Sequence, residues 1–210
     1  MSDFVQLHLH SSYSILDGVA NPEEYAALAK KVGMSSLALT DHGTMSGILR
    51  FSNACKKEGI NGIIGCEFYI NNRIGEFIPK GEKNPNAHVV ILSKNKRGYK
   101  NMLKINYHSF VEGFYYRARI SRKFLFEHSE GTICLTACMG GEIPQLIGKG
   151  ERKAAENLLL EYKEVFGDDL YGELEFNEIE AQQKVTWGMY ELCKKNKVKF
   201  VLTGDCHYLN

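Results

Sequence analysis

Short apolar segments alternate with helix-periodic segments along the whole chain. Alternating or continuous apolar runs, typical of strands, fall at residues 4–8, 36–40, 60–70, 87–92, 132–135, 170–176 and 199–203. The first helix begins at Asn21-Pro22-Glu23-Glu24, where an N-cap, a first-turn proline and two acids coincide. Further helical patterns follow at 47–57, 98–112, 142–147, 151–166 and 180–195.

This alternation predicts an α/β fold with a mostly parallel sheet, open or closed into a barrel, and we favour the barrel. Seven predicted strands do not fit a symmetric eight-stranded barrel, so we expect a distorted one. The segment 71–86 is rich in proline, glycine and asparagine and predicts an exposed loop without a helix. The strands on either side of it are therefore expected to form an antiparallel hairpin, because a parallel pair needs a long crossover.

Composition narrows the class of protein. The chain has 210 residues, 44% of them hydrophobic and 24% charged, which fits one folded domain over residues 1–210 and excludes disorder as the main state. No apolar run is long enough to span a bilayer and no secretory signal is visible, so we expect a cytoplasmic protein without a membrane partner. The net charge of +1 predicts that any contact with nucleic acid is local.

The histidines carry the chemical signal. His8, His10, His42 and His207 lie at or just after strand ends, which in a parallel α/β architecture form the edge where active sites are built. His88 opens a strand instead. If that strand is antiparallel to the one holding Glu67, His88 returns to the same edge, beside Glu67.

Other ligand-type side chains end separate strands. His8 and His10 are two apart, so on a strand both face one side about 7 Å apart, but such a pair alone is weak evidence for a metal. The hypothesis of a metal site gains from further candidates at other strand ends: Asp17, Asp41-His42-Gly43, Glu67, Cys138 and Asp205-Cys206-His207.

These motifs resemble a known family. The strings are His8-Leu9-His10-Ser11, Leu16-Asp17-Gly18, Leu39-Thr40-Asp41-His42-Gly43, Gly65-Cys66-Glu67, Ala87-His88, Ala137-Cys138-Met139-Gly140 and Gly204-Asp205-Cys206-His207-Tyr208. In this order they resemble the PHP domain, and more narrowly the PHP domain at the N-terminus of the bacterial DNA polymerase III alpha subunit. The segment from Phe114 to Ile120 and the string Gly140-Gly141-Glu142-Ile143-Pro144 are also similar to that subfamily.

The resemblance implies a distorted (β/α)7 barrel with three divalent metal ions at the carboxyl ends of its strands. It implies His8, His10, Glu67 and Asp205 at one ion, Glu67, His88 and Cys138 at a second, and Asp17, His42 and His207 at a third. Imidazole and thiolate suit zinc, and the carboxylates also allow manganese or iron. Three such ions would outweigh the charges of their ligands and attract phosphate.

The function implied is metal-dependent phosphodiester hydrolysis by metal-bound water, without a covalent protein intermediate. Within a DNA polymerase III alpha subunit this would be a 3′→5′ exonuclease acting on single-stranded or mispaired DNA ends. Arg119 would contact phosphate, because the family aligns an arginine there. The polymerase domains of the same longer chain would follow, and a proofreading subunit is a possible partner.

Several alternatives stay open. The domain could be a catalytically silent structural or subunit-binding module whose metals act as staples, or a free-standing phosphatase for small phosphomonoesters. Cys138, at a strand-to-helix turn, could instead be the nucleophile of a cysteine hydrolase. Arg117 could stack and bind a single strand or simply be solvated, and Asp41 is expected to orient an imidazole.

Overall fold

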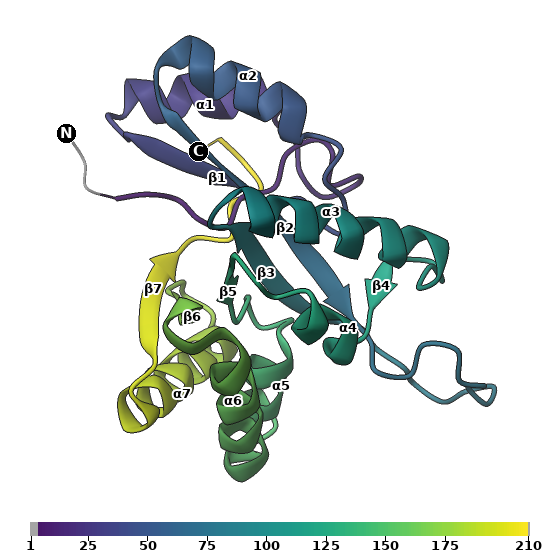
Figure 1. Cartoon of the computed structure of the whole chain (residues 1–210). Helices are drawn as coiled ribbons and strands as arrows, with labels where there is room; N and C mark the ends of the chain where they lie inside the picture. Colours follow the sequence, from purple (N-terminus) through teal and green to yellow (C-terminus); the bar gives the residue numbers. More distant parts are fainter. Residues whose placement is uncertain (1–3, 210) are drawn as a thin grey trace.

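The computed structural model describes residues 4–209 and is built on one mixed β-sheet. Its strands are β1 (Ser36–Leu39), β2 (Asn61–Ile70), β3 (Ala87–Ser93), β4 (Arg119–Ile120), β5 (Thr132–Leu135), β6 (Leu170–Glu175) and β7 (Lys199–Thr203). The strand order is β1-β2-β3-β5-β6-β7, and the short β4 pairs with the end of β2. The sheet curls, so β1 and β7 lie at its two free sides (Figure 1).

Seven α-helices surround the sheet: α1 (Pro22–Lys31), α2 (Ile48–Glu58), α3 (Lys96–Val111), α4 (Arg122–Glu127), α5 (Glu142–Gly148), α6 (Arg152–Phe166) and α7 (Glu180–Asn196). Helices α1 and α2 pack together at the β1 side, and α5, α6 and α7 form a group at the opposite side, near β6 (Figure 1). The helix α1 begins with the predicted capping box, in which Asn21 and Glu24 bind each other's backbone N–H groups. None of the helices within residues 4–209 is long and apolar enough to cross a membrane.

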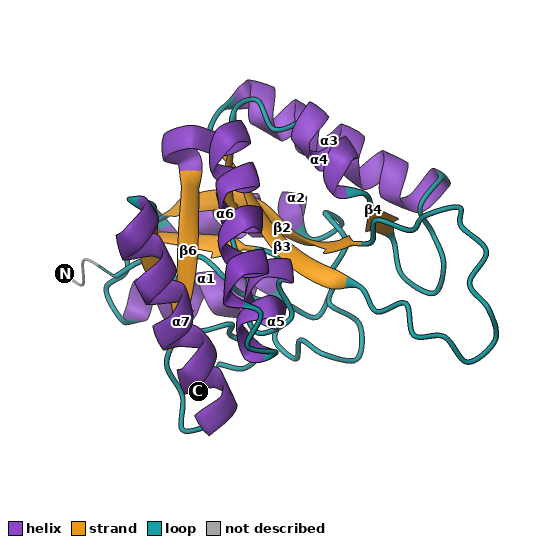
Figure 2. Cartoon of the chain, turned by 90° about the horizontal axis from the view of Figure 1, so that it is seen from below, coloured by secondary structure: helices purple, strands orange, loops and turns teal. Residues whose placement is uncertain are grey.

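The predicted hairpin is confirmed. The strands β2 and β3 are antiparallel, with Glu67 opposite Val90 and Tyr69 opposite His88, and β3 is also antiparallel to β5. The connection over residues 71–86 contains no helix and extends away from the body of the protein (Figure 2). The end of β2 and the start of β3 therefore share one edge of the sheet.

The predicted first strand at residues 4–8 is wrong. Residues 6–10 make only isolated bridges, because the segment changes partner partway along its length. The Thr40 N–H donates to the Leu9 carbonyl at 2.9 Å, and the His10 N–H donates to the Cys206 carbonyl at 2.8 Å. The N-terminal segment thus lies between the β1 side and the segment after β7, and it closes the sheet into the distorted barrel expected from the sequence.

The interior of this barrel is apolar away from the site. Ala38, Val90, Leu92, Leu135 and Ala137 form a separate buried cluster contributed by different strands. In the antiparallel register Glu67 is the partner of Val90, so the acid stands directly beside this apolar cluster. The polar groups at the site are also buried from water, so they must compensate one another through hydrogen bonds or opposite charge.

A close backbone contact fixes α3 against the turn before β5. A Cβ placed on Gly98 would lie 1.7 Å from the Gly131 carbonyl oxygen, which is backbone and cannot move alone.

We expect Gly98→Ala to lower the free energy of unfolding by about 1–3 kcal/mol, measured by urea denaturation. The matched variant Gly148→Ala, in α5, meets only a side chain at 3.6 Å. It should be neutral or slightly stabilising, and equal losses in the two variants would contradict this account.

Candidate metal centre

The carboxylate of Glu67 is the centre of the site. It comes from β2, is 1% exposed, and lies among four imidazoles. Its Oε1 atom lies 3.4 Å from His8 Nε2 and 3.0 Å from His88 Nδ1. Its Oε2 atom lies 3.4 Å from His10 Nε2 and 2.6 Å from His42 Nδ1. The hairpin has brought His88 to Glu67 as the sequence predicted.

Two aspartates extend the cluster on either side. Asp205 Oδ1 lies 3.3 Å from His8 Nε2 and 3.2 Å from His10 Nε2. Asp17 Oδ2 lies 2.7 Å from His42 Nε2 and 3.3 Å from His207 Nε2. One cluster therefore draws on the N-terminal segment, the end of β1, β2, β3 and the segment after β7.

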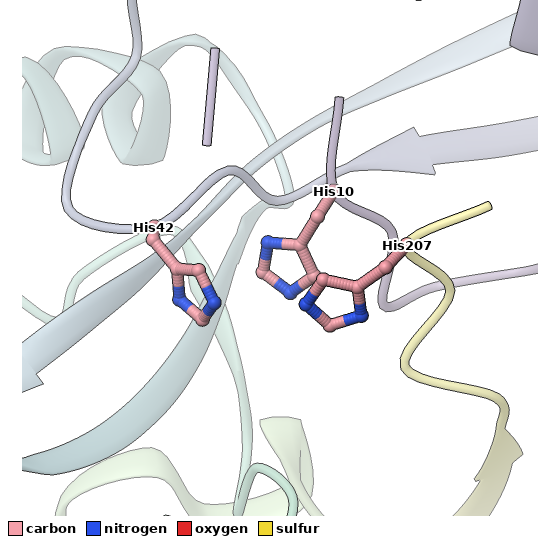
Figure 3. Close-up of side chains that lie close together, drawn as sticks. All are labelled: His10, His42 and His207. Carbon is pink, nitrogen blue, oxygen red and sulfur yellow. The ribbon is translucent and has the colours of Figure 1, made fainter. Parts of the chain in front are cut away.

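The His10 ring stacks on two other imidazoles, those of His42 and His207. The His10 ring lies 4.0 Å from the His42 ring and 4.4 Å from the His207 ring, centroid to centroid, and Figure 3 shows the three side chains converging from separate segments. A nitrogen atom of each falls within 4.8 Å of a nitrogen atom of the other two. Such convergence of imidazole nitrogens suits a divalent metal ion.

The buried polar atoms of the cluster lack hydrogen-bond partners. Within the described residues, these atoms are His8 Nε2, His10 Nε2, His42 Nδ1, His88 Nδ1, Asp205 Oδ1 and both carboxylate oxygens of Glu67. Buried polar groups are normally satisfied, because each unmade hydrogen bond costs about 1–3 kcal/mol. Imidazole nitrogens and carboxylate oxygens that face one another without partners fit a site for divalent ions.

Hydrogen bonds at the far side of the rings fix which nitrogen faces the cluster. His8 Nδ1 lies 2.8 Å from Glu173 Oε1, an acceptor, so His8 donates from Nδ1 and presents the lone pair of Nε2. His207 likewise donates from Nδ1 to the Asp205 backbone carbonyl at 2.9 Å.

Ser14 does the same for His10. The Ser14 hydroxyl donates to Asp41 Oδ1 at 2.8 Å, which leaves its oxygen to accept from His10 Nδ1 at 3.1 Å. Asp41 also accepts from the Ser11 backbone N–H and hydroxyl, and all of these groups are buried. Asp41 therefore acts on an imidazole, as expected from the sequence, but through a serine.

Negative charge accumulates on the inner side of the cluster. Burial and the neighbouring Glu173 carboxylate raise the pKa of Glu175 to about 8, against a partial opposing effect of His8. Asp205 behaves differently: burial opposes its ionisation, but the adjacent imidazoles of His10 and His8 outweigh burial and lower the pKa of Asp205 to about 2. Bound cations would relieve this crowding of carboxylates.

Cys138 lies at the edge of the cluster. It follows β5, and its sulfur accepts from the Gly140 N–H at 3.4 Å. The Gly140 carbonyl in turn accepts from the His88 N–H at 2.8 Å, which brings this turn to the start of β3. Burial, then the carboxylates of Glu67 and Asp205, raise the pKa of the Cys138 thiol.

Known proteins resemble this chain over most of its length. A PHP domain profile matches residues 6–177. The chain belongs to the PHP domain family. It is also 42% identical over 211 residues to the DNA polymerase III subunit alpha of Borreliella burgdorferi and 39% identical over 214 residues to that of Aquifex aeolicus, covering 100% and 99% of this chain. It spans 18% of the length of each relative.

Solved structures share the fold of this PHP domain. An amidohydrolase from Chromobacterium violaceum, solved with bound sulfate and no metal, matches with a TM-score of 0.57 and 15% identity, covering 97% of this chain and 87% of that one. A protein from Bifidobacterium adolescentis, described as a metal-dependent phosphoesterase, matches with a TM-score of 0.55 and 13% identity over the same shares.

The two arginines of the 114–120 segment lie in different places. Arg117 lines an open cleft of about 740 Å³ together with Asp17 and His42. Arg119 is buried, donates from Nε to the Gly113 carbonyl at 3.0 Å, and lines a second cavity. The arginine next to the histidine cluster of this PHP domain is thus Arg117, whereas Arg119 faces the neighbouring cavity.

Glu173, Glu175 and Ser14 are not among the site residues predicted from the sequence. Glu173 and Glu175 are two apart in the otherwise apolar strand β6, so both face the barrel interior, and that spacing was an available signal. They form a buried group with His8 in which the oxygen and nitrogen atoms lie within 4.8 Å. Ser14 had no comparable signal, because only the fold brings it between Asp41 and His10.

The Ser14 contact yields a prediction for metal affinity. Ser14→Ala removes the acceptor of His10 Nδ1, so the ring no longer has a fixed tautomer, and we expect about 10–100-fold weaker metal binding. Competition against a chromophoric chelator measures this affinity. Ser12→Ala is the matched control, because Ser12 lies in the same loop with an exposed side chain. Unchanged affinity in a folded Ser14→Ala protein would refute the role of Ser14.

Proposed function

We propose that this chain is the metal-dependent phosphoesterase domain of a bacterial replicative DNA polymerase alpha subunit, and that it hydrolyses phosphodiesters as a 3′→5′ exonuclease. In this proposal residues 1–210 form a single PHP domain that binds three divalent ions through His8, His10, Asp17, His42, Glu67, His88, Cys138, Asp205 and His207. The main support is the set of buried imidazole and carboxylate atoms that face one another without hydrogen-bond partners.

The ions, when bound, would act as Lewis acids toward the phosphate and would activate water for attack on phosphorus. The protein contributes the ligand geometry. Glu173 and Ser14 hold the His8 and His10 rings with Nε2 directed inward, so these ligands need no reorientation when an ion binds. Imidazole, carboxylate and one thiol suit zinc or manganese and also allow iron.

The open cleft supports a phosphoester substrate. It lies beside Asp17 and His42 and includes Arg117, whose guanidinium lies 5.7 Å from the centre of the Tyr69 ring. Tyr69 in turn stacks on His42 at 5.8 Å. Arg117 can therefore bind a phosphate oxygen next to the cluster, because arginine presents several fixed donors to phosphate.

The environment of Cys138 argues against a cysteine hydrolase. A nucleophilic cysteine needs a thiolate, which helix N-termini or nearby cations stabilise. Burial and the adjacent carboxylates instead raise the pKa of Cys138 and keep the thiol protonated near neutral pH in the absence of metal. A role for Cys138 as a ligand, deprotonated only when an ion binds, agrees better with these surroundings.

The polymerase context extends the proposal to partners. The chain spans 18% of the length of its DNA polymerase III alpha relatives, so polymerase domains of the same chain would adjoin it. Its substrate would be the single-stranded end of DNA, and a proofreading subunit is a candidate partner. The site of action would be the cytoplasm.

Mutation of His10 tests the enzyme. We expect wild-type protein to retain divalent metal, measured by inductively coupled plasma mass spectrometry, and to shorten a 5′-labelled single-stranded oligonucleotide from its 3′ end. His10→Ala removes an imidazole that lies beside both Glu67 and Asp205. We expect this change to reduce the rate of hydrolysis at least about 100-fold. His128→Ala is the control, since His128 packs on Phe124 outside the cluster. Wild-type protein without metal and without hydrolysis would refute the proposal.

A structural role for the ions has its own support. His8 and His10 belong to the closing N-terminal segment, Glu67 to β2, and Asp205 to the segment after β7. Ions shared by these residues would hold the barrel closed whether or not hydrolysis follows.

Metal removal separates the two roles. A ligand that binds only the folded state at about 100 times its Kd adds roughly 2.7 kcal/mol of stability, so EDTA should lower Tm by about 5–10 °C. Differential scanning calorimetry measures the change, and added zinc or manganese should reverse it. A lower Tm in a protein that never cleaves an oligonucleotide would favour the structural module. An unchanged Tm would speak against bound ions in either role.

A further inference from the structure

One arginine ends an exposed turn, another lies just after it, and each lies over a tyrosine ring. Arg117 lies over Tyr69, and the guanidinium carbon of Arg119 is 5.2 Å from the centre of the Tyr115 ring. Neither arginine has a carboxylate within ion-pair distance among residues 4–209. Arg119 is only 8% exposed. Arginines are rarely buried without a counter-charge, so Arg119 remains able to pair with an anion from outside.

The turn over residues 115–117, just before Arg119, presents Tyr116 to solvent. The Tyr115 N–H donates to the Arg117 carbonyl at 3.0 Å, and Tyr116 adopts the left-handed conformation with φ of 56°. Its side chain is 83% exposed. A large aromatic ring held outward in a backbone conformation that is unusual for tyrosine suggests a binding role.

Tyr116 and Phe114 separate two cavities. The first is the cleft of about 740 Å³ that contains Arg117 and reaches His42. The second, of about 770 Å³, contains Arg119 and is bounded by residues of the 71–86 loop. Both residues line both cavities, so the two spaces adjoin across an aromatic ridge made of Phe114 and Tyr116.

The acidic residues of the second cavity are already engaged. Glu76 and Glu82 pair with Arg73, and Glu112 lies 3.5 Å from His108. Arg119 is therefore available to an incoming anion. Its planar guanidinium, fixed by Gly113 and Tyr115, is preorganised for a phosphate.

We propose that the aromatic ridge and Arg119 form a binding track for single-stranded nucleic acid, several nucleotides long, that begins at the histidine cluster. Bases stack on Phe114 and Tyr116, one backbone phosphate binds Arg117 in the cleft, and a phosphate farther along the strand binds Arg119. The proposal rests on the proposed function for what happens at the cluster, but the binding itself requires no metal. Because the bases stack on the ridge, binding of the strand tolerates different base sequences.

Oligonucleotide binding in EDTA tests the track. Fluorescence anisotropy with labelled oligothymidylates of increasing length should give a Kd that falls from the mononucleotide to about the octamer. Tyr116→Asn removes the ring but suits the left-handed backbone, and it should raise Kd for the octamer about tenfold or more. Tyr107→Asn, at another exposed tyrosine outside both cavities, is the matched control and should leave Kd unchanged.

The variant Arg119→Gln tests the phosphate contact through the salt dependence of Kd, which a loss of packing alone would not change. Removing one phosphate contact should reduce the slope of log Kd against log salt concentration by about 0.7. Circular dichroism verifies the fold, and if this variant is unfolded the Tyr116 comparison decides alone. Equal binding of mononucleotide and octamer, equal effects at Tyr116 and Tyr107, or equally strong competition by polyglutamate would overturn the track. Binding in EDTA by a protein that hydrolyses no oligonucleotide after zinc or manganese is restored would leave the track intact and refute the exonuclease.

Discussion

The structure depends on the burial of one carboxylate among four imidazoles. Glu67 is almost inaccessible to solvent, stands beside the apolar interior of the barrel, and touches side chains from three other segments. A carboxylate in this position is tolerable only with positive charge or hydrogen bonds around it. The need to compensate Glu67 therefore links closure of the barrel to the arrangement of the four imidazoles around it.

Support for the cluster lies one layer further out. Glu173 and Thr203 hold one side of the His8 ring, and the Ser14 hydroxyl connects His10 to Asp41. These outer groups fix the orientation of the His8 and His10 rings, so that Nε2 of each ring is directed into the cluster. Arg117 and the aromatic ridge lie on the solvent side of the same histidines, which gives the site a rigid inner wall and an open outer one.

The sequence predicted those features that follow from local pattern or from a fixed connection. The helix-free 71–86 segment implied the hairpin, and the hairpin implied the His88–Glu67 contact. Residues 4–8 were misassigned, because hydrophobic alternation does not reveal that a segment exchanges partners midway. The position of Ser14 depends on its contact with Asp41, and that of Arg119 on the Gly113 carbonyl and the Tyr115 ring. No local sequence pattern encodes these contacts. The Glu173–Glu175 spacing was readable but was overlooked.

The closing segment has a consequence for synthesis. His8 and His207, about 200 positions apart, belong to the same cluster, in which Asp205 Oδ1 lies 3.3 Å from His8 Nε2 and 3.7 Å from His207 Nδ1. At roughly 5–20 residues per second, translation leaves His8 waiting about 10–40 s before His207 is made. Throughout that interval the nascent polypeptide carries early histidines and acids that lack their final neighbours. Assembly of the complete histidine cluster is thus confined to the end of translation of this region, and a chain that stops short of His207 lacks one of its imidazoles.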